Sequence, residues 1–191
     1  MKDTKTLVTY GLLTAIIVLM AFTPIGYLKM PGIEITFLMI PVIVGAVTLG
    51  PGGGAFLGGI FGLTSFVQAF GMSKFGAELM AINPIFTFIT CMIPRILMGM
   101  CCGFIFKAFN DKTKTLPYFV ASISGAVLNT FFFMTTLILL FGNSEYIKAM
   151  QGGKNLLAFL VVSIGINGAV EAIVAAIAGT AIGKAVGKLL K

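Results

Sequence analysis

The chain has 191 residues, a mean hydropathy of +1.07 and only 10% charged residues, whereas a soluble globular domain has about 25%. This composition excludes a soluble globule. The net charge of +7 does not indicate a nucleic-acid partner, because the lysines are scattered at the ends of apolar segments and form no basic face.

Six apolar segments follow one another along the chain, and most have the length needed to cross a bilayer core of about 30 Å. The second and third are short, and a helix does not continue comfortably through the Gly/Pro run 50–54 between them. They form a tight re-entrant pair or two short spans. The sequence therefore predicts an all-α membrane protein, with residues 1–191 as a single integral-membrane domain and a bundle of six transmembrane helices. The segments are expected at about residues 7–28, 35–50, 53–70, 81–107, 116–141 and 156–186.

The distribution of lysines predicts the orientation of these spans. If the N-terminus is inside, the cytoplasmic side carries Lys2, Lys5, Lys107, Lys112, Lys114, Lys184, Lys188 and Lys191, against Lys29, Lys74, Lys148 and Lys154 outside. Cytoplasmic connections carry an excess of positive charge. Both termini are therefore predicted to be cytoplasmic, with outer connections at residues 23–36, 71–80 and 142–154.

Four polar residues are predicted to share one layer deep in the apolar segments. Counting inward from the outer ends places Arg95, Asn129, Asn167 and Glu171 about 16 to 23 Å below the outer surface. Asn167 and Glu171 share a helix face because they are four residues apart. One interpretation is the polar floor of an outward-opening cavity. The alternative is a salt bridge between Arg95 and Glu171 that locks two helices, since charges inside a membrane normally pair.

Three further polar residues lie closer to the predicted outer surface. Thr64 and Gln68 share a face at the end of the third segment, and Asn83 begins the fourth. We expect them to line the mouth of the same cavity, with hydrogen bonds between helices as the alternative.

Small residues four apart predict places where helices approach closely. Internal packing of the bundle is the favoured interpretation for most of them. Gly11 and Ala15 are the exception, because they lie in the cytoplasmic half of the first segment, where a partner subunit can dock. The pairs assigned to internal packing join Gly54, Gly58 and Gly62, Gly99 and Gly103, and Gly179 and Gly183.

Nothing in the chain indicates an enzyme. The glycine runs lack the Gly-Lys-Ser/Thr ending of a phosphate-binding loop, and histidine is absent, so no serine has a histidine base. We predict no catalytic residues, no metal and no cofactor.

Taken together, several short motifs resemble those of a known family, the substrate-binding S components of energy-coupling factor (ECF) vitamin transporters. The resemblance covers nearly the whole chain, and each motif alone is weak. The motifs are Pro24-Ile25-Gly26-Tyr27, the stretches 40–46, 49–51 and 61–66, Ile93-Pro94-Arg95 with the residues to 99, and Asn167-Gly168-Ala169-Val170-Glu171 with the residues to 173.

This resemblance implies a multi-pass protein of a prokaryotic plasma membrane that captures a vitamin from outside. It implies as partners a transmembrane coupling subunit and two ABC ATPases. Gly11 and Ala15 stand where the family carries its small-residue contact with the coupling subunit.

The motifs most resemble the pantothenate S component. Hydrogen-bonding amides suit this small polar acid, and a cation such as Arg95 or Lys29 suits its carboxylate. Tyr27, in the neighbouring turn, is included in the predicted site. Riboflavin and folate remain alternative vitamins.

The alternative from a different class is a small autonomous secondary transporter in which Arg95 and Glu171 form a proton or ion relay. A relay needs groups that change protonation near neutral pH, and arginine does not. We therefore favour the vitamin-binding component.

Overall fold

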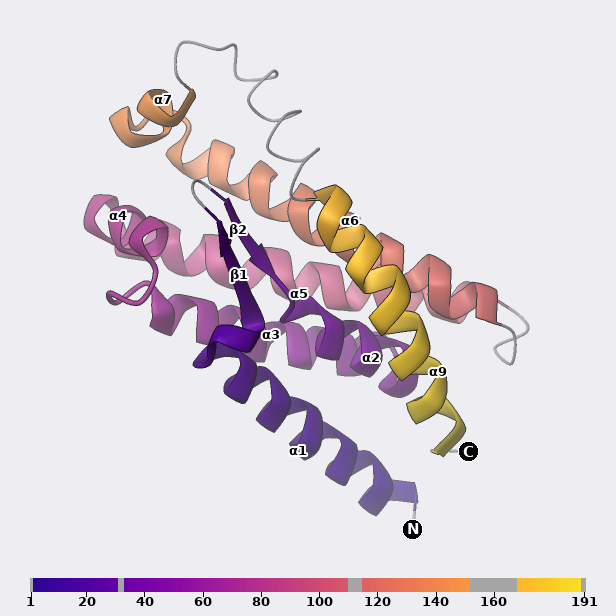
Figure 1. The fold of residues 1–191 in the computed structure, drawn as a ribbon. Helices are drawn as coiled ribbons and strands as arrows, with labels where there is room; N and C mark the ends of the chain where they lie inside the picture. The colour runs from indigo at the N-terminus through magenta and orange to yellow at the C-terminus, as the bar shows by residue number, and fades with distance from the viewer. Residues whose placement is uncertain (1, 31–32, 110–114, 152–167, 190–191) are drawn as a thin grey trace.

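Helices form almost all of the computed structural model, which describes residues 2–30, 33–109, 115–151 and 168–189 (Figure 1). The helical bundle predicted from the sequence is therefore confirmed. In chain order the elements are α1 (Lys2–Ala21), the 3-10 turn η1 (Pro24–Gly26), β1 (Tyr27–Met30), β2 (Ile33–Thr36), α2 (Met39–Leu49), α3 (Pro51–Gln68), α4 (Lys74–Ile82), α5 (Pro84–Ala108), α6 (Thr115–Phe141), α7 (Glu145–Gln151) and a C-terminal helix, residues 168–189, that contains the π-helical turn η2 (Ala175–Gly179) and ends in α9 (Thr180–Leu189).

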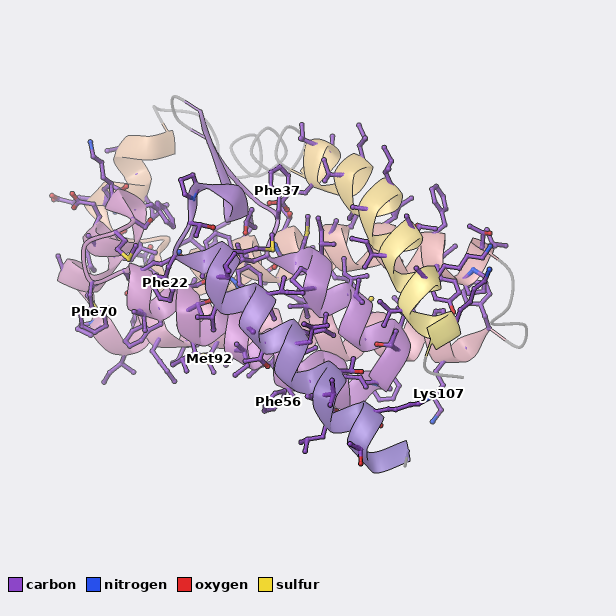
Figure 2. All side chains as sticks on the ribbon, turned by 60° about the horizontal axis from the view of Figure 1, so that its bottom comes forward. Phe22, Phe37, Phe56, Phe70, Met92 and Lys107 are labelled. Atoms are coloured by element: carbon purple, nitrogen blue, oxygen red, sulfur yellow. The ribbon has the colours of Figure 1, made fainter. Side chains whose placement is uncertain are left out.

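Four helices within the described residues are long and apolar enough to cross a membrane: Thr4–Ala21, Pro84–Ala108, Thr115–Phe141 and Gly168–Lys188. The apolar helix Met39–Leu49 is shorter. Large apolar side chains also cover the outside of the bundle, where Figure 2 shows Phe22, Phe56 and Phe70 at the periphery. A surface of this kind suits contact with lipid rather than water.

The first helix ends earlier than the sequence predicted, at Ala21 instead of residue 28. Pro24 and Gly26 follow within five residues and disfavour its continuation. The chain then forms a two-stranded antiparallel hairpin in which Tyr27 pairs with Thr36. The sequence predicts a span end and a connection in this region, so the hairpin is an addition to the predicted all-α architecture.

The break between α2 and α3 is also narrower than predicted. Only Gly50 interrupts the helices, with a φ of 85° that favours glycine. Pro51 occupies the start of α3, where its missing N–H has no cost. The glycines 52–54 are helical, so the third segment begins at residue 51 rather than 53.

The short helix α2 lies at the centre of the molecule. Its side chains Val42, Ile43 and Ala46 are fully buried, and they belong to the main apolar core together with Leu57 of α3 and Met98 of α5. A helix that is apolar on every face is stable only when neighbours surround it. The 11 residues of α2 span about 16 Å.

Both chain termini lie toward the same end of the bundle as the end of α5, whereas α4 and α7 lie at the opposite end (Figure 1). The sequence predicts connections where the structure has the short helices α4 and α7. A second apolar cluster, made of Leu79, Leu137, Phe141 and Ile147, packs these two helices onto α6.

The C-terminal helix changes its winding at η2, where five residues form a π-helical turn. Directly after this turn, the Thr180 N–H donates to the carbonyl of Ile177, three residues earlier. Single π-turns inside α-helices are frequent near functional sites.

Candidate functional site

Glycines bring α3 and α5 into backbone contact, and this contact positions Arg95. A Cβ atom on any of three α3 glycines would overlap the backbone of α5: Gly54 faces the Gly99 carbonyl, Gly58 the Arg95 carbonyl and Gly62 the Cys91 carbonyl. The small-residue packing predicted for these glycines is confirmed. It leaves the Arg95 side chain buried inside the bundle, with 9% exposed.

The Arg95 guanidinium occupies a position that Pro94 creates. Proline has no N–H, so the carbonyl of Thr90 four residues earlier loses its helical partner. The Arg95 Nη1 donates to this carbonyl at 2.7 Å. The guanidinium carbon also lies 4.5 Å from the Phe133 ring centroid and 5.3 Å from that of Phe61, which adds cation–π attraction.

The Glu171 carboxylate joins three segments of the chain. Its Oε1 accepts from the Thr36 backbone N–H at 3.2 Å, and its Oε2 accepts from the Thr130 hydroxyl at 3.0 Å. The side chain is only 4% exposed. Beyond these bonds, Glu171 is attracted electrostatically by Arg95. A buried carboxylate is tolerated when hydrogen bonds of this kind replace its hydration.

Asn129 lies beside this carboxylate and is 4% exposed. Its side chain lies near enough to the Glu171 carboxylate to interact with it electrostatically. The Asn129 Oδ1 is buried and has no hydrogen-bond partner among the residues that the structure describes. An amide oxygen in such a place is a ready acceptor for a ligand donor.

Contacts between the helices show that these three residues share a depth. The Cys102 thiol of α5 donates to the Ala121 carbonyl of α6 at 3.2 Å. Seven residues from that contact toward the α4 and α7 end, the same count reaches Arg95 on α5 and Leu128 on α6, so these two residues lie at the same depth. The bond from Thr130 places Glu171 at nearly the same level. Arg95, Asn129 and Glu171 thus lie within about one helical turn of one another in depth.

The residues predicted at the cavity mouth lie nearer the α4 and α7 end, and each has a contact within the bundle. The Thr64 hydroxyl donates to the Phe61 carbonyl at 2.9 Å. Gln68 donates through Nε2 to the Ala21 carbonyl at the end of α1. Asn83 caps α5, because its Oδ1 accepts from the N–H groups of Ile85 and Phe86 at 3.0 and 3.1 Å. The predicted alternative, a hydrogen bond between helices, thus describes Gln68, whereas the Thr64 bond stays within α3.

Three predicted site residues have no described side-chain geometry. Asn167 lies outside the described residues. The backbones of Tyr27 and Lys29 belong to β1, and their side chains also lie outside the description.

Several residues around the site were missed by sequence reasoning. Thr130 is adjacent to Asn129 and was detectable as a second polar residue at the same depth. Thr90 was detectable as the residue four before Pro94. The Thr36 backbone had no detectable signal, because it reaches Glu171 across 135 residues of sequence.

Gly11 and Ala15 are exposed on α1, away from the polar layer. A Cβ atom at Gly11 would meet nothing within 4 Å. The two positions therefore form part of an open, small-residue surface.

The hydrogen bonds of Glu171 predict a difference between two substitutions. Glu171→Leu will lower the free energy of unfolding by about 2 to 4 kcal/mol, since it leaves the donors of Thr36 and Thr130 buried without an acceptor at about 1 to 2 kcal/mol each. Glu171→Gln will cost less, because the amide oxygen can accept from the Thr36 N–H and the amide nitrogen can donate to the Thr130 hydroxyl. Thermal unfolding in detergent measures both. Equal losses would indicate instead that the charge itself, acting through Arg95, holds the helices together.

Comparison with known proteins gives the same family for almost the whole chain. The family model described as "ECF transporter, substrate-specific component" matches residues 5–182. The chain is 32% identical over 150 residues to the pantothenic acid transporter PanT of Lactococcus lactis subsp. cremoris, covering 71% of this chain and 74% of that protein. It is 30% identical over 183 residues to the pantothenate transporter PanT of Leuconostoc mesenteroides subsp. mesenteroides, covering 90% and 87% respectively.

Proposed function

From the premise that this chain belongs to the family of ECF transporter substrate-specific components, we propose that it captures pantothenate at the outer face of a prokaryotic plasma membrane. It is a transport protein and not an enzyme. The proposal is supported by both relatives, which are pantothenate transporters. The structural observation that carries it is a buried polar layer that holds a guanidinium, a carboxylate and an amide oxygen without a partner among the described residues.

The chemistry of pantothenate matches this layer. The molecule has a carboxylate at one end, two hydroxyls at the other and an amide between them. Arg95 supplies a buried positive charge for an acid, and Asn129 and Glu171 supply hydrogen-bonding groups. We include Asn167 in the same floor because it precedes Glu171 by four residues.

The rim of the proposed site is formed by the remaining polar residues closer to α4 and α7. They are proposed to contact the vitamin as it enters and to set the shape of the mouth. The rim consists of Thr64, Gln68, Asn83, Tyr27 and Lys29.

The proposed topology has six membrane crossings, with α2 and α3 added to the four long apolar helices. Both termini are proposed to be cytoplasmic. The position of both termini at the end of the bundle opposite α4 and α7 supports this orientation (Figure 1). Two exposed lysines, Lys107 and Lys188, also lie in the last turns of α5 and α9, and an excess of positive charge is expected on the cytoplasmic side.

The proposed partners are a transmembrane coupling subunit and two ABC ATPases, which together form the ECF module. Gly11 and Ala15 are the proposed contact with the coupling subunit. The open surface at these positions supports it, because small residues let a second helix approach closely.

Ligand-dependent unfolding of the purified protein tests the substrate. Pantothenate at about one hundred times its Kd will raise the free energy of unfolding by about 2.7 kcal/mol. Riboflavin and folate at equal concentration are the comparison ligands, and we expect no stabilisation from either. Stabilisation by one of them without pantothenate would reassign the vitamin.

Uptake into vesicles separates the family mechanism from autonomous transport. Vesicles with this chain, the coupling subunit and both ATPases are expected to accumulate pantothenate only with ATP inside the compartment that holds the ATPases. Accumulation by the chain alone would contradict the proposed coupling.

A further inference from the structure

The part of the polar layer around Asn129 holds an amide oxygen beside a carboxylate. The Asn129 Oδ1 is buried and has no partner within the described part of the chain. Its neighbour is the Glu171 carboxylate, which can only accept hydrogen bonds when ionised. Leaving a buried amide oxygen unsatisfied costs about 1 to 3 kcal/mol. A ligand that places a donor here recovers this free energy, so this part of the site selects donors.

A ligand carboxylate does not suit the same place. It has no hydrogen to donate at neutral pH, and it would face the negative charge of Glu171. Hydroxyl groups suit it, because each supplies one donor and can also accept.

The positive charge of the site lies farther toward the α4 and α7 end. The Arg95 side chain reaches back along α5 to the Thr90 carbonyl, five residues earlier. Its guanidinium carbon lies 4.5 Å from the ring of Phe133, four residues beyond Asn129 on α6. Four residues of helix correspond to about 6 Å. The donor-selecting floor and the cation are therefore separated along the bundle axis.

We infer that pantothenate lies along the bundle axis, with its hydroxyl-bearing end against Asn129 and Glu171 and its carboxylate toward Arg95 and the α4 and α7 end. A hydroxyl of the ligand donates to the Asn129 Oδ1. This inference rests on the proposed function and adds to it the direction of the bound ligand and the group that Asn129 recognises.

Binding of modified ligands to two proteins tests the inference. The ligands are pantothenate, the analogue without its secondary hydroxyl, the analogue without its primary hydroxyl, and panthenol, in which an alcohol replaces the carboxylate. The proteins are the wild type and Asn129→Leu, which keeps a similar volume and removes the amide. Isothermal titration in detergent gives each Kd.

We expect Asn129→Leu to weaken pantothenate binding by about tenfold or more. One of the two deoxy analogues will bind both proteins with Kd values within about twofold, because the hydrogen bond is already missing in each case. The ratio of pantothenate affinity to panthenol affinity will be the same in both proteins, because the carboxylate that panthenol lacks lies at the end of the ligand far from Asn129.

Ser122→Ala is the matched control. Ser122 is also fully buried, its hydroxyl has no partner within the part of the chain that the structure describes, and it lies on the same helix as Asn129, seven residues away. Its removal will leave all four Kd values unchanged.

Three outcomes would overturn the inference. The first is an equal loss of affinity for all four ligands on Asn129→Leu, and the second is a pantothenate-to-panthenol ratio that collapses in this variant. The third is that both deoxy analogues bind the wild type as tightly as pantothenate does. This outcome needs only the wild type, so it can be tested even if Asn129→Leu does not fold. Failure of the wild type to bind pantothenate at all would instead remove the proposed function, and the inference with it.

Discussion

Gly58→Ala will largely abolish folding, or lower the free energy of unfolding by about 3 kcal/mol or more, at the upper end of the range for overpacked cores. The added Cβ would overlap the Arg95 carbonyl oxygen, and it would lie 2.7 Å from the carbonyl carbon and 3.1 Å from the Ile96 Cα. These are backbone atoms of a long helix, so they cannot turn aside as a side chain can. The whole of α5 would have to move away from α3.

The neighbouring glycine supplies the control. A Cβ at Gly59 would lie 3.8 Å from the Ile96 Cγ1, an ordinary contact. Gly59→Ala is therefore expected to be neutral or to stabilise α3 by up to about 1 kcal/mol, the difference in helix propensity between the two residues. Thermal unfolding and size-exclusion chromatography in detergent compare them. Similar behaviour of the two variants would show that the close approach of α3 and α5 does not limit stability.

Gly11→Trp will leave pantothenate binding within about twofold of wild type and reduce ATP-driven uptake to background. The first expectation follows from the open surface, because nothing lies within 4 Å of the added Cβ and no described contact of the polar layer involves α1 at this position. The second follows from the proposed docking role, because an indole at a small-residue contact keeps the two helices apart.

A tryptophan on another exposed apolar surface controls for the change in size. Leu139 on α6 is 78% exposed, and Leu139→Trp is expected to preserve both binding and uptake. Co-purification with the coupling subunit should fail for Gly11→Trp and succeed for Leu139→Trp. Normal assembly of Gly11→Trp would move the docking surface elsewhere.

The parts of the fold that the sequence predicted follow from the membrane environment itself. The length of an apolar segment predicts a membrane-spanning helix. The long helices therefore lie where the sequence predicts them, although their ends are displaced by several residues. Polar residues are rare in such segments, so counting depth was enough to bring Arg95, Asn129 and Glu171 into one layer. Glycines four apart likewise predicted close packing inside the bundle, and in the structure this packing joins α3 and α5.

The parts that could not be predicted depend on tertiary contacts or on single backbone angles. The hairpin formed by β1 and β2 replaces what looked like a helix end, because its strands are only four residues each and leave little periodic pattern. Gly50 alone breaks α2 from α3, although five Gly and Pro residues occur together there. The bond from the Thr36 N–H to Glu171 required the positions of both segments in space.

The π-helical turn Ala175–Gly179 affects how the C-terminal helix keeps phase with α6. Glu171 contacts Thr130, and eight residues later Gly179 packs against Ser122. Eight residues of regular α-helix turn the contact face by about 80°. A π-turn holds roughly one more residue per turn, which reduces that rotation to about 20°. The helix thus carries the equivalent of a one-residue insertion, and a chain with one residue fewer here would present the same two contacts from an unbroken α-helix.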